Sequence, residues 1–367
     1  MNIRLTKITA FQLFALVILN QVGFNVLTIP FPQSHDAGYD AWLSILLGGV
    51  WAQLIILVIY WLCTRYPDMP LPQSIRLIAG QAVGTFLNLI IAIYCLESSL
   101  LIIVSYADVI NRWVLYATPW SVLIGISIFI AAYVASSTLR VIATITQTII
   151  LMFLLCLILI FISGMGKGSF LHFLPMGAHG LGPILKASLP AFWVYAGYEL
   201  LLYVFPYVDN RSHKKTLLVM TAANGATTFL YVMVALIVTH NFNESQLSAI
   251  PEPLIFLLRQ FNWPVMQSLD ILMIAVWFSI TTVTAYVYLF LAARYFAFIR
   301  KSEIRRHGLL VFIFAVIMFL AGLWGSDRSH IHLFSNYHNI ATVVVVAAMP
   351  AILLIVSLAR GKKGSME

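Results

Sequence analysis

The stretch NQVGFN at residues 20–25 places three side-chain amides and a glycine inside an apolar run from Phe11 to Ile29. Residues 193–199, WVYAGYE, interrupt a second apolar run from Leu185 to Phe205 with a glycine and a carboxylate. Polar groups are costly within lipid unless they face protein or a wet cavity. The first interruption indicates either a polar stripe packed against neighbouring helices or an unwound segment whose freed backbone groups bind a ligand. The second interruption, again a weak helix, favours the unwound segment.

The composition places both runs in a membrane. Apolar residues make up 61% of the 367 residues, against roughly 45–50% in a soluble domain, and charged residues make up 9% against roughly 25%. Soluble globular, disordered and nucleic-acid-binding proteins are excluded, despite a net charge of +8. Cys63, Cys95 and Cys156 lie in apolar runs and form no C-x-x-C pair, so we interpret them as small apolar residues.

The apolar runs predict an all-α polytopic membrane protein of about ten transmembrane helices, because crossing a bilayer takes about 20 apolar residues. The eighth run stays apolar to about Ile299, which predicts a long, tilted helix. The ten runs are Phe11 to Ile29, Ala41 to Cys63, Val83 to Val104, Pro119 to Ala135, Val141 to Ser163, Leu185 to Phe205, Leu217 to Val238, Ser268 to Phe290, Gly308 to Gly325, and Ile340 to Leu358.

Most lysine and arginine residues lie in those segments between the runs that would share one side of the membrane. With the N-terminus inside, 16 of the 21 basic residues face the cytoplasm, where such residues accumulate. This alternation predicts ten spans with both termini cytoplasmic, and it assigns the basic excess to the membrane face. The first run is too long for a signal peptide, contains amides and lacks a small-residue cleavage pattern, so we interpret it as the first span.

The interrupted runs are the first and the sixth, five spans apart. Because five is odd, a repeat of five spans places its second copy upside down, as in many secondary transporters whose substrate lies at the membrane midplane. We therefore predict one membrane domain over residues 1–367, with inverted repeats at about 8–164 and 183–360. Broken helices occupy matching positions, and Gly23 aligns with Gly197.

Several motifs resemble the spore-germination permease family, the membrane B subunits of GerA-type nutrient germinant receptors within the amino acid–polyamine–organocation superfamily. The resemblance runs from about residue 8 to residue 360. The motifs are Gly23-x-x-x-Leu27-x-x-Pro30, Ala37-Gly38-x-Asp40-Ala41-Trp42, Thr118-Pro119 and Gly197-x-Glu199.

This resemblance implies a LeuT-type five-plus-five fold and a small nutrient ligand, commonly an amino acid. It also implies a signalling role with A and C subunits in the inner membrane of an endospore. We expect a transporter-like nutrient-sensing subunit. The alternative is an active amino acid permease that works by alternating access, which needs the same pocket.

Unwound helices would suit a zwitterion, because half-helix N-termini attract a carboxylate and freed carbonyls attract an ammonium. The candidate ligand-binding residues of the interrupted spans are Asn20, Gln21, Gly23, Asn25, Tyr195, Gly197, Tyr198 and Glu199. Resemblance to the superfamily adds the third and eighth spans as pocket walls, with Tyr94, Glu97, Ser98, Ser279, Thr281, Thr282 and Thr284.

The intramembrane carboxylates Glu97 and Glu199 are expected either to function or to have a structural partner. For Glu199 the expected partner is a ligand ammonium, a hydroxyl such as that of Tyr94, or bound water. Asp270 is expected to be solvated near the outer end of the eighth span. The fifth span has no lysine, so no fixed ammonium can replace a sodium ion there, which leaves uphill transport open.

No H-E-x-x-H motif, Cys/His ligand spacing or phosphate loop occurs, so we expect no enzyme, cofactor, catalytic residue or metal site. We interpret His330, His332 and His338 as solvated residues of the last outer loop. The basic loop from Arg294 to Arg306 serves either as a topology anchor, with contact to anionic lipid, or as a docking surface for an A subunit.

Overall fold

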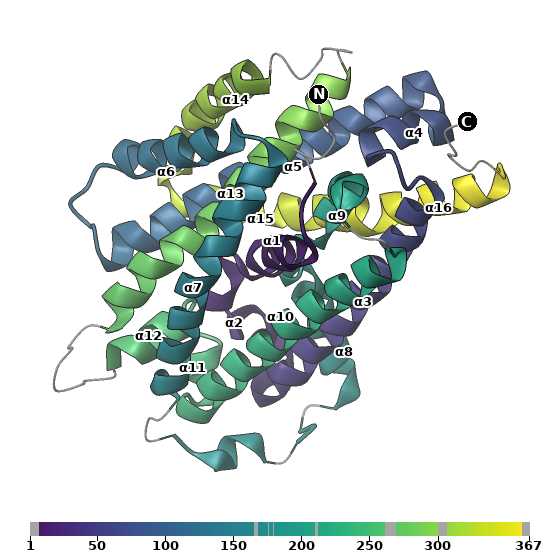
Figure 1. Cartoon of the computed structure of the whole chain (residues 1–367). Coiled ribbons are helices and arrows are strands. Elements are labelled where there is room, and N and C mark those ends of the chain that lie inside the picture. The colour runs from purple at the N-terminus through teal and green to yellow at the C-terminus, as the bar shows by residue number, and fades with distance from the viewer. Residues whose placement is uncertain are drawn as a thin grey trace.

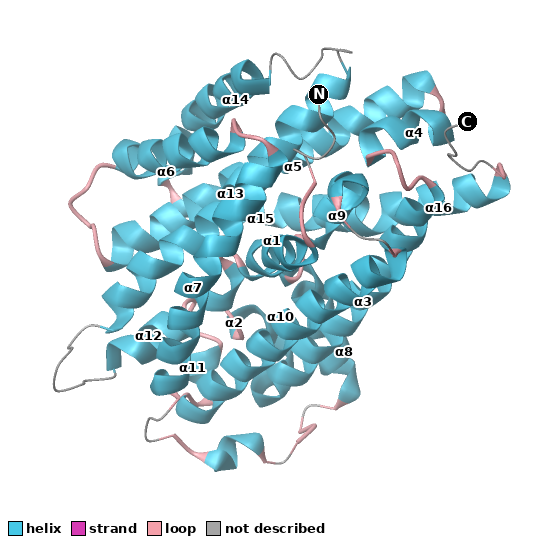
Figure 2. Ribbon diagram, viewed as in Figure 1, coloured by secondary structure: helices cyan, strands magenta, loops and turns pink. Residues whose placement is uncertain are grey.

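The structure is a computed structural model that describes residues 7–164, 168–174, 176–178, 180–209, 212–260, 269–299 and 307–361. Within these ranges the regular elements are helices. One isolated parallel bridge pairs Ile8 with Val208. Figure 2 shows this all-helical fold, which confirms the predicted fold class.

The helices differ widely in length. Six helices each supply a candidate membrane span, alone or together with a short flanking helix: α3 (Ala41–Arg65), α5 (Gln81–Trp113), α7 (Leu139–Ser163), α10 (His213–Asn241), α13 (Leu269–Ile299) and α14 (His307–Gly322). The others are α1 (Ala10–Val22), η2 (Asn25–Leu27), α2 (Phe31–Ala37), η3 (Gly38–Asp40), α4 (Leu71–Ala79), α6 (Trp120–Ala135), η4 (Phe170–Phe173), α8 (Leu181–Val194), η5 (Tyr198–Leu200), α9 (Leu201–Val204), η6 (Phe205–Tyr207), α11 (Glu244–Leu247), α12 (Pro253–Gln260), η8 (Leu323–Ser326), α15 (Arg328–Thr342), η9 (Val343–Ala348) and α16 (Met349–Ala359).

Membrane-crossing length can be assigned to only some of these elements. In the described part of the chain, seven helices are long and apolar enough to cross a membrane, or eight if the bent pair of α8 and Tyr198–Tyr207 is one span. The shorter apolar helices α1 and α6 coincide with two further predicted runs. The count of ten and the division into inverted repeats stay predictions. The last span runs from Arg328 to Ala359 and starts earlier than the predicted Ile340.

Both predicted helix breaks are present. Helix α1 ends at Val22, and Gly23 then adopts a φ of +32°, which glycine reaches without strain. Helix α8 ends at Val194, and the chain bends by 48° before it continues from Tyr198. Gly197 has a φ of +129° at this bend.

The broken helix α1 lies at the centre of the bundle. It packs against α7, α10 and α13, and all of its residues from Leu13 to Val22 but Phe14 are buried. In Figure 1 it stands between the α5–α13 pair and the α3–α10 pair. The most extensive helix contact joins α5 to α13, and α8 packs mainly along α3. The two breaks therefore meet inside the protein rather than at its lipid-facing surface.

Candidate functional site

The three side-chain amides of the first break bind backbone carbonyls at the second break. Those carbonyls lack their helical partners, because α8 ends at Val194 and the chain turns at Gly197. The bonds run from Asn20 Nδ2 to Gly197 O (3.0 Å), from Gln21 Nε2 to Tyr195 O (3.1 Å) and from Asn25 Nδ2 to Val194 O (3.1 Å). The structure thus brings together the predicted residues of the two interrupted spans.

Side chains of α10 and α13 satisfy the carbonyls freed in the first break in the same way. The donors are Trp277 Nε1 to Gly23 O (2.7 Å), Tyr231 OH to Gln21 O (2.8 Å) and Thr284 Oγ1 to Asn20 O (3.3 Å). A non-helical backbone is tolerated inside a membrane only where such partners exist. The breaks are therefore built into the fold by surrounding helices.

Gln21 lies at the centre of this hydrogen-bond network. Its Nε2 also donates to Asn224 Oδ1 (3.2 Å), and its Oε1 accepts from Thr227 Oγ1 (3.1 Å). The sequence left open an unwound segment or a packed polar stripe, and the first break has both properties.

Sequence reasoning named Thr284 but missed the other partners on α10 and α13, although helical spacing carries a signal for each group. Asn224, Thr227 and Tyr231 are spaced by three and four residues, which places them on one face of α10. Trp277 and Thr284 lie two turns apart on α13, and Tyr288 lies one turn further along.

Two polar atoms beside the breaks have no hydrogen-bond partner among the described residues. They are Asn20 Oδ1 and the hydroxyl of Tyr198, and the Tyr198 side chain is fully buried. Tyr195, by contrast, donates its hydroxyl to Ile45 O (3.0 Å) and anchors the break to α3. A buried polar atom without a partner costs about 1–3 kcal/mol, so these two atoms are the points at which a polar ligand would add stability.

Glu199 is buried and accepts two hydrogen bonds. The backbone N–H of Gly197 donates to its Oε2 (2.6 Å), and the hydroxyl of Tyr288 donates to its Oε1 (2.5 Å). The expected hydroxyl partner is present, but it belongs to Tyr288 instead of Tyr94. Tyr94 packs edge-on against Tyr288, with ring centroids 6.2 Å apart.

Glu97 contacts a histidine that was expected in a loop. His338 Nδ1 lies 2.8 Å from Glu97 Oε2, because the helix α15 begins after Asp327 and carries His338 alongside α5. All three histidines, His330, His332 and His338, lie in helix α15, so the expectation of a loop was wrong for each of them. His330 and His338 are also half-buried, whereas His332 is exposed as expected. Ser98 donates to Tyr94 O within α5. The described ranges contain no cluster of three His, Cys, Asp or Glu that could hold a metal ion.

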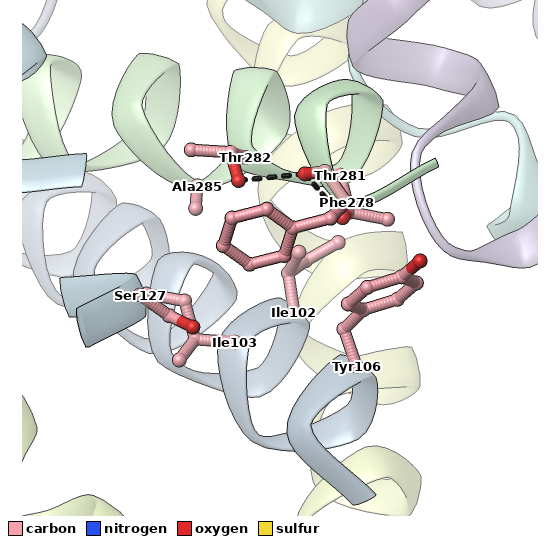
Figure 3. A pocket seen from close by; sticks show the side chains of 8 residues that line it. All are labelled: Ile102, Ile103, Tyr106, Ser127, Phe278, Thr281, Thr282 and Ala285. Carbon is pink, nitrogen blue, oxygen red and sulfur yellow. Dashed lines mark hydrogen bonds between the residues drawn. The ribbon is translucent and has the colours of Figure 1, made fainter. Parts of the chain in front are cut away.

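Thr281 and Thr282 do not reach the breaks. Their hydroxyls donate to Phe278 O within α13, and both residues line a cavity of about 10 Å³ between α5, α6 and α13 (Figure 3). That cavity has no lining residue from α1 or α8. Ser279 is half-buried on the same helix. Asp270 is 5% exposed at the start of α13, so the expected solvation was wrong.

Comparisons with known proteins agree with this architecture. Residues 7–331 match the family model described as spore germination protein. The chain is 23% identical to the spore germination protein GerQB of Bacillus cereus, over 74% of each chain. It is 20% identical to the spore germination protein YndE of Bacillus subtilis (strain 168), over 96% of each chain. A crystal structure of a mutant Eremococcus coleocola manganese transporter superposes with a TM-score of 0.58 at 14% identity, covering 95% of this chain and 76% of the transporter.

Proposed function

Because this chain belongs to the spore germination protein family, we propose that it is a transporter-like nutrient-sensing subunit of a spore germinant receptor. Its ligand is a small nutrient of amino acid type, held near the membrane midplane between the breaks in α1 and α8. This family consists of receptor-type or transporter-type membrane proteins, and the apolar helices make the chain an integral membrane protein.

The observation that carries the proposal is the set of polar groups left at the joined breaks. Asn20 Oδ1 and the carboxylate of Glu199 are acceptors, and a carboxylate can accept about four hydrogen bonds. Glu199 accepts two, from Gly197 and Tyr288, so it retains capacity for an ammonium. The unpartnered hydroxyl of Tyr198 is a donor for a ligand carboxylate. The two ends of a zwitterion therefore match this set.

A ligand screen on purified protein in lipid nanodiscs tests the proposal. Each standard amino acid is added separately, and the melting temperature of the protein is recorded. We expect at least one amino acid to raise the melting temperature in a concentration-dependent way, because a ligand that binds only the folded state stabilises it. The matched N-acetylated, amidated compound, which lacks both charges, should have no effect. A melting temperature unchanged by every amino acid would overturn the amino acid assignment.

The proposed partners are A and C subunits in the inner membrane of an endospore, with both termini of this chain in the cytoplasm. The basic loop is the proposed docking surface for the A subunit. Arg294 belongs to α13, where its guanidinium lies over the Phe290 ring, and residues 300–306 lie outside the described ranges. Replacing the four basic residues Arg300, Lys301, Arg305 and Arg306 by glutamate should abolish co-purification of the A subunit. If the variant instead fails to insert into the membrane, the basic loop serves as a topology anchor and is not the docking surface.

A working amino acid permease is the second candidate function. The fold similarity to a solved transporter favours it, since transport requires the same broken helices. Liposomes containing only this chain decide between the two. Accumulation of an amino acid against its gradient would establish transport, whereas binding without accumulation would leave the sensing role.

A further inference from the structure

A groove on the surface of the bundle separates α7 from α10 near their C-terminal ends. It is lined by Phe161 and Gly164 of α7 and by five residues of α10 from Phe229 to Ile237, and its volume is about 380 Å³. All of these lining residues are apolar. Phe161 is 52% exposed and Phe229 is 69% exposed, so the groove is open at the surface of the protein.

The groove exists because α7 and α10 are held apart. Both helices pack against α1 and against α12, but in the described part of the chain they make little contact with each other. In Figure 1 the two helices converge toward their C-terminal ends. There Ile237 packs on Gly164, since a Cβ atom at position 164 would lie only 3.1 Å from Ile237 Cγ1. This contact closes one end of the groove.

The groove lies on the face of α10 that is turned away from the helix breaks. Asn224 and Tyr231 face the breaks, whereas Phe229 and Leu236 lie on the opposite side of the helix at 3.6 residues per turn. Residues 229–237 lie about 6–18 Å before the end of α10 at Asn241. One leaflet of the hydrocarbon core is about 15 Å thick, so the groove faces hydrocarbon.

A gap at this depth requires an apolar occupant. Lining atoms without neighbours lose van der Waals contacts, and such packing is what holds membrane proteins together in lipid. Water would need two to four polar partners, which the apolar side chains of the groove do not offer. The occupant therefore comes from lipid or from another apolar protein segment.

The dimensions of the groove favour a single hydrocarbon chain. From Phe229 to Ile237 it extends about 12 Å along α10. Its volume over that length corresponds to a mean width of about 5–6 Å. A helix with its side chains is about 10–12 Å across, which is too wide to enter. The carbon atoms of an extended chain contact their neighbours at about 3.5–4.0 Å, so one chain fits this width.

We propose that this groove binds one acyl chain of a membrane phospholipid, in the leaflet that contains the C-terminal ends of α7 and α10. The chain fills the gap between the two helices and joins them where their own side chains do not meet. Because the opposite face of α10 carries Asn224 and Tyr231, the bound chain also supports the helix that holds the breaks. The site does not depend on which ligand the breaks bind.

Photolabelling of the full chain in lipid nanodiscs tests this site. The nanodiscs contain phosphatidylglycerol with a diazirine in one acyl chain, and the labelled residues are identified by mass spectrometry. The control surface is the exposed apolar face of α14 formed by Val316, Ile317 and Leu320. These residues lie about 9–15 Å before the end of their span at Ser326, a depth similar to that of the groove.

We expect residues 229–237 to be labelled several-fold more strongly than the α14 face, because a bound chain stays beside its lining longer than a chain in the bulk bilayer. Leu236→Trp fills the groove and should reduce its labelling to the level of the α14 face. Leu320→Trp is the matched control, since it makes the same exchange on α14, and it should leave labelling of the groove unchanged.

Three results would overturn the proposal. The first is equal labelling of the groove and the α14 face in the wild type, and this comparison alone decides if Leu236→Trp does not fold. The second is labelling of the groove that persists in folded Leu236→Trp. The third is a groove that is protected from the lipid probe in native membranes while the α14 face is labelled, because a protein partner would then occupy it.

Discussion

The side-chain amide of Gln21 donates to the backbone carbonyl of Tyr195 across 3.1 Å, although the two residues are 174 positions apart. The donor belongs to the end of α1 and the acceptor to the turn after α8. One interrupted helix therefore supplies the hydrogen-bond partners that the other lacks. Removing either interruption would leave unpaired polar groups in the other, so we infer that the two breaks stabilise each other.

Gln21→Leu should destabilise the protein by about 2 kcal/mol or more. The change introduces an apolar side chain of similar size and leaves the buried Tyr195 carbonyl and the Thr227 hydroxyl without the partner that Gln21 supplies. Each such group costs about 1–3 kcal/mol. The melting temperature in detergent measures the effect. Gln53→Leu is the matched control, because Gln53 bonds Asn224 and Thr221 at the partly exposed edge of the same network. An equal decrease of the melting temperature in both variants would contradict the central role of Gln21.

Gly197→Ala should prevent or strongly reduce folding. Gly197 has a φ of +129°, and a Cβ atom there would lie 2.9 Å from the Asn20 carbonyl carbon and the Gln21 nitrogen, both of which are backbone atoms. Backbone strain alone costs about 1–3 kcal/mol. The readout is the yield of monodisperse protein after membrane extraction. Gly225→Ala is the control, since Gly225 lies within helix α10 with open space around its Cα. Its yield should be unchanged or slightly raised.

Arg112→Met should destabilise the protein by about 3 kcal/mol. Arg112 pairs with Asp108 (2.8 Å) and with Glu252 (2.6 Å), and the Glu252 side chain is only 6% exposed. Breaking a buried ion pair strands a charge, which costs about 3–5 kcal/mol, and Arg328 at 3.6 Å offsets part of that cost. Thermal unfolding of the purified protein measures the difference.

Lys186→Met provides the comparison for that experiment. Lys186 pairs with Asp36 at 2.8 Å, but its side chain is 72% exposed. Exposed ion pairs contribute about 1 kcal/mol or less, so this variant should unfold close to the wild type. If Lys186→Met destabilises the protein as much as Arg112→Met does, burial does not determine how much an ion pair contributes to stability.

Glu199→Gln should weaken binding of the responding amino acid by about 1.5–3 kcal/mol while protein abundance stays normal. The substitution keeps the side-chain shape and removes the charge that an ammonium would meet, and hydrogen bonds to charged groups have this magnitude. Calorimetric titration of the ligand gives the value. Glu199→Leu should lower abundance as well, because Tyr288 and the Gly197 N–H would lose their acceptor. Normal abundance and an unchanged affinity in Glu199→Gln would remove Glu199 from the ligand site.

The sequence alone predicted the all-helical membrane fold and the positions of both breaks. The apolar content of each run and the polar residues at 20–25 and 193–199 are local properties, since lipid imposes the same requirement on every segment that crosses it. The long eighth helix was also visible locally, and α13 extends to Ile299 as predicted.

Only the tertiary structure decided which side chains serve these breaks. Trp277, Tyr231 and Tyr288 come from helices far along the chain, and a hydrogen bond depends on which faces of distant helices meet. For the same reason Thr281 and Thr282 line a separate cavity. His338 illustrates the limit most directly, because its neighbours in sequence are polar and resemble a loop. Its pairing with Glu97 arises only when α15 packs against α5, where a half-buried carboxylate requires a partner.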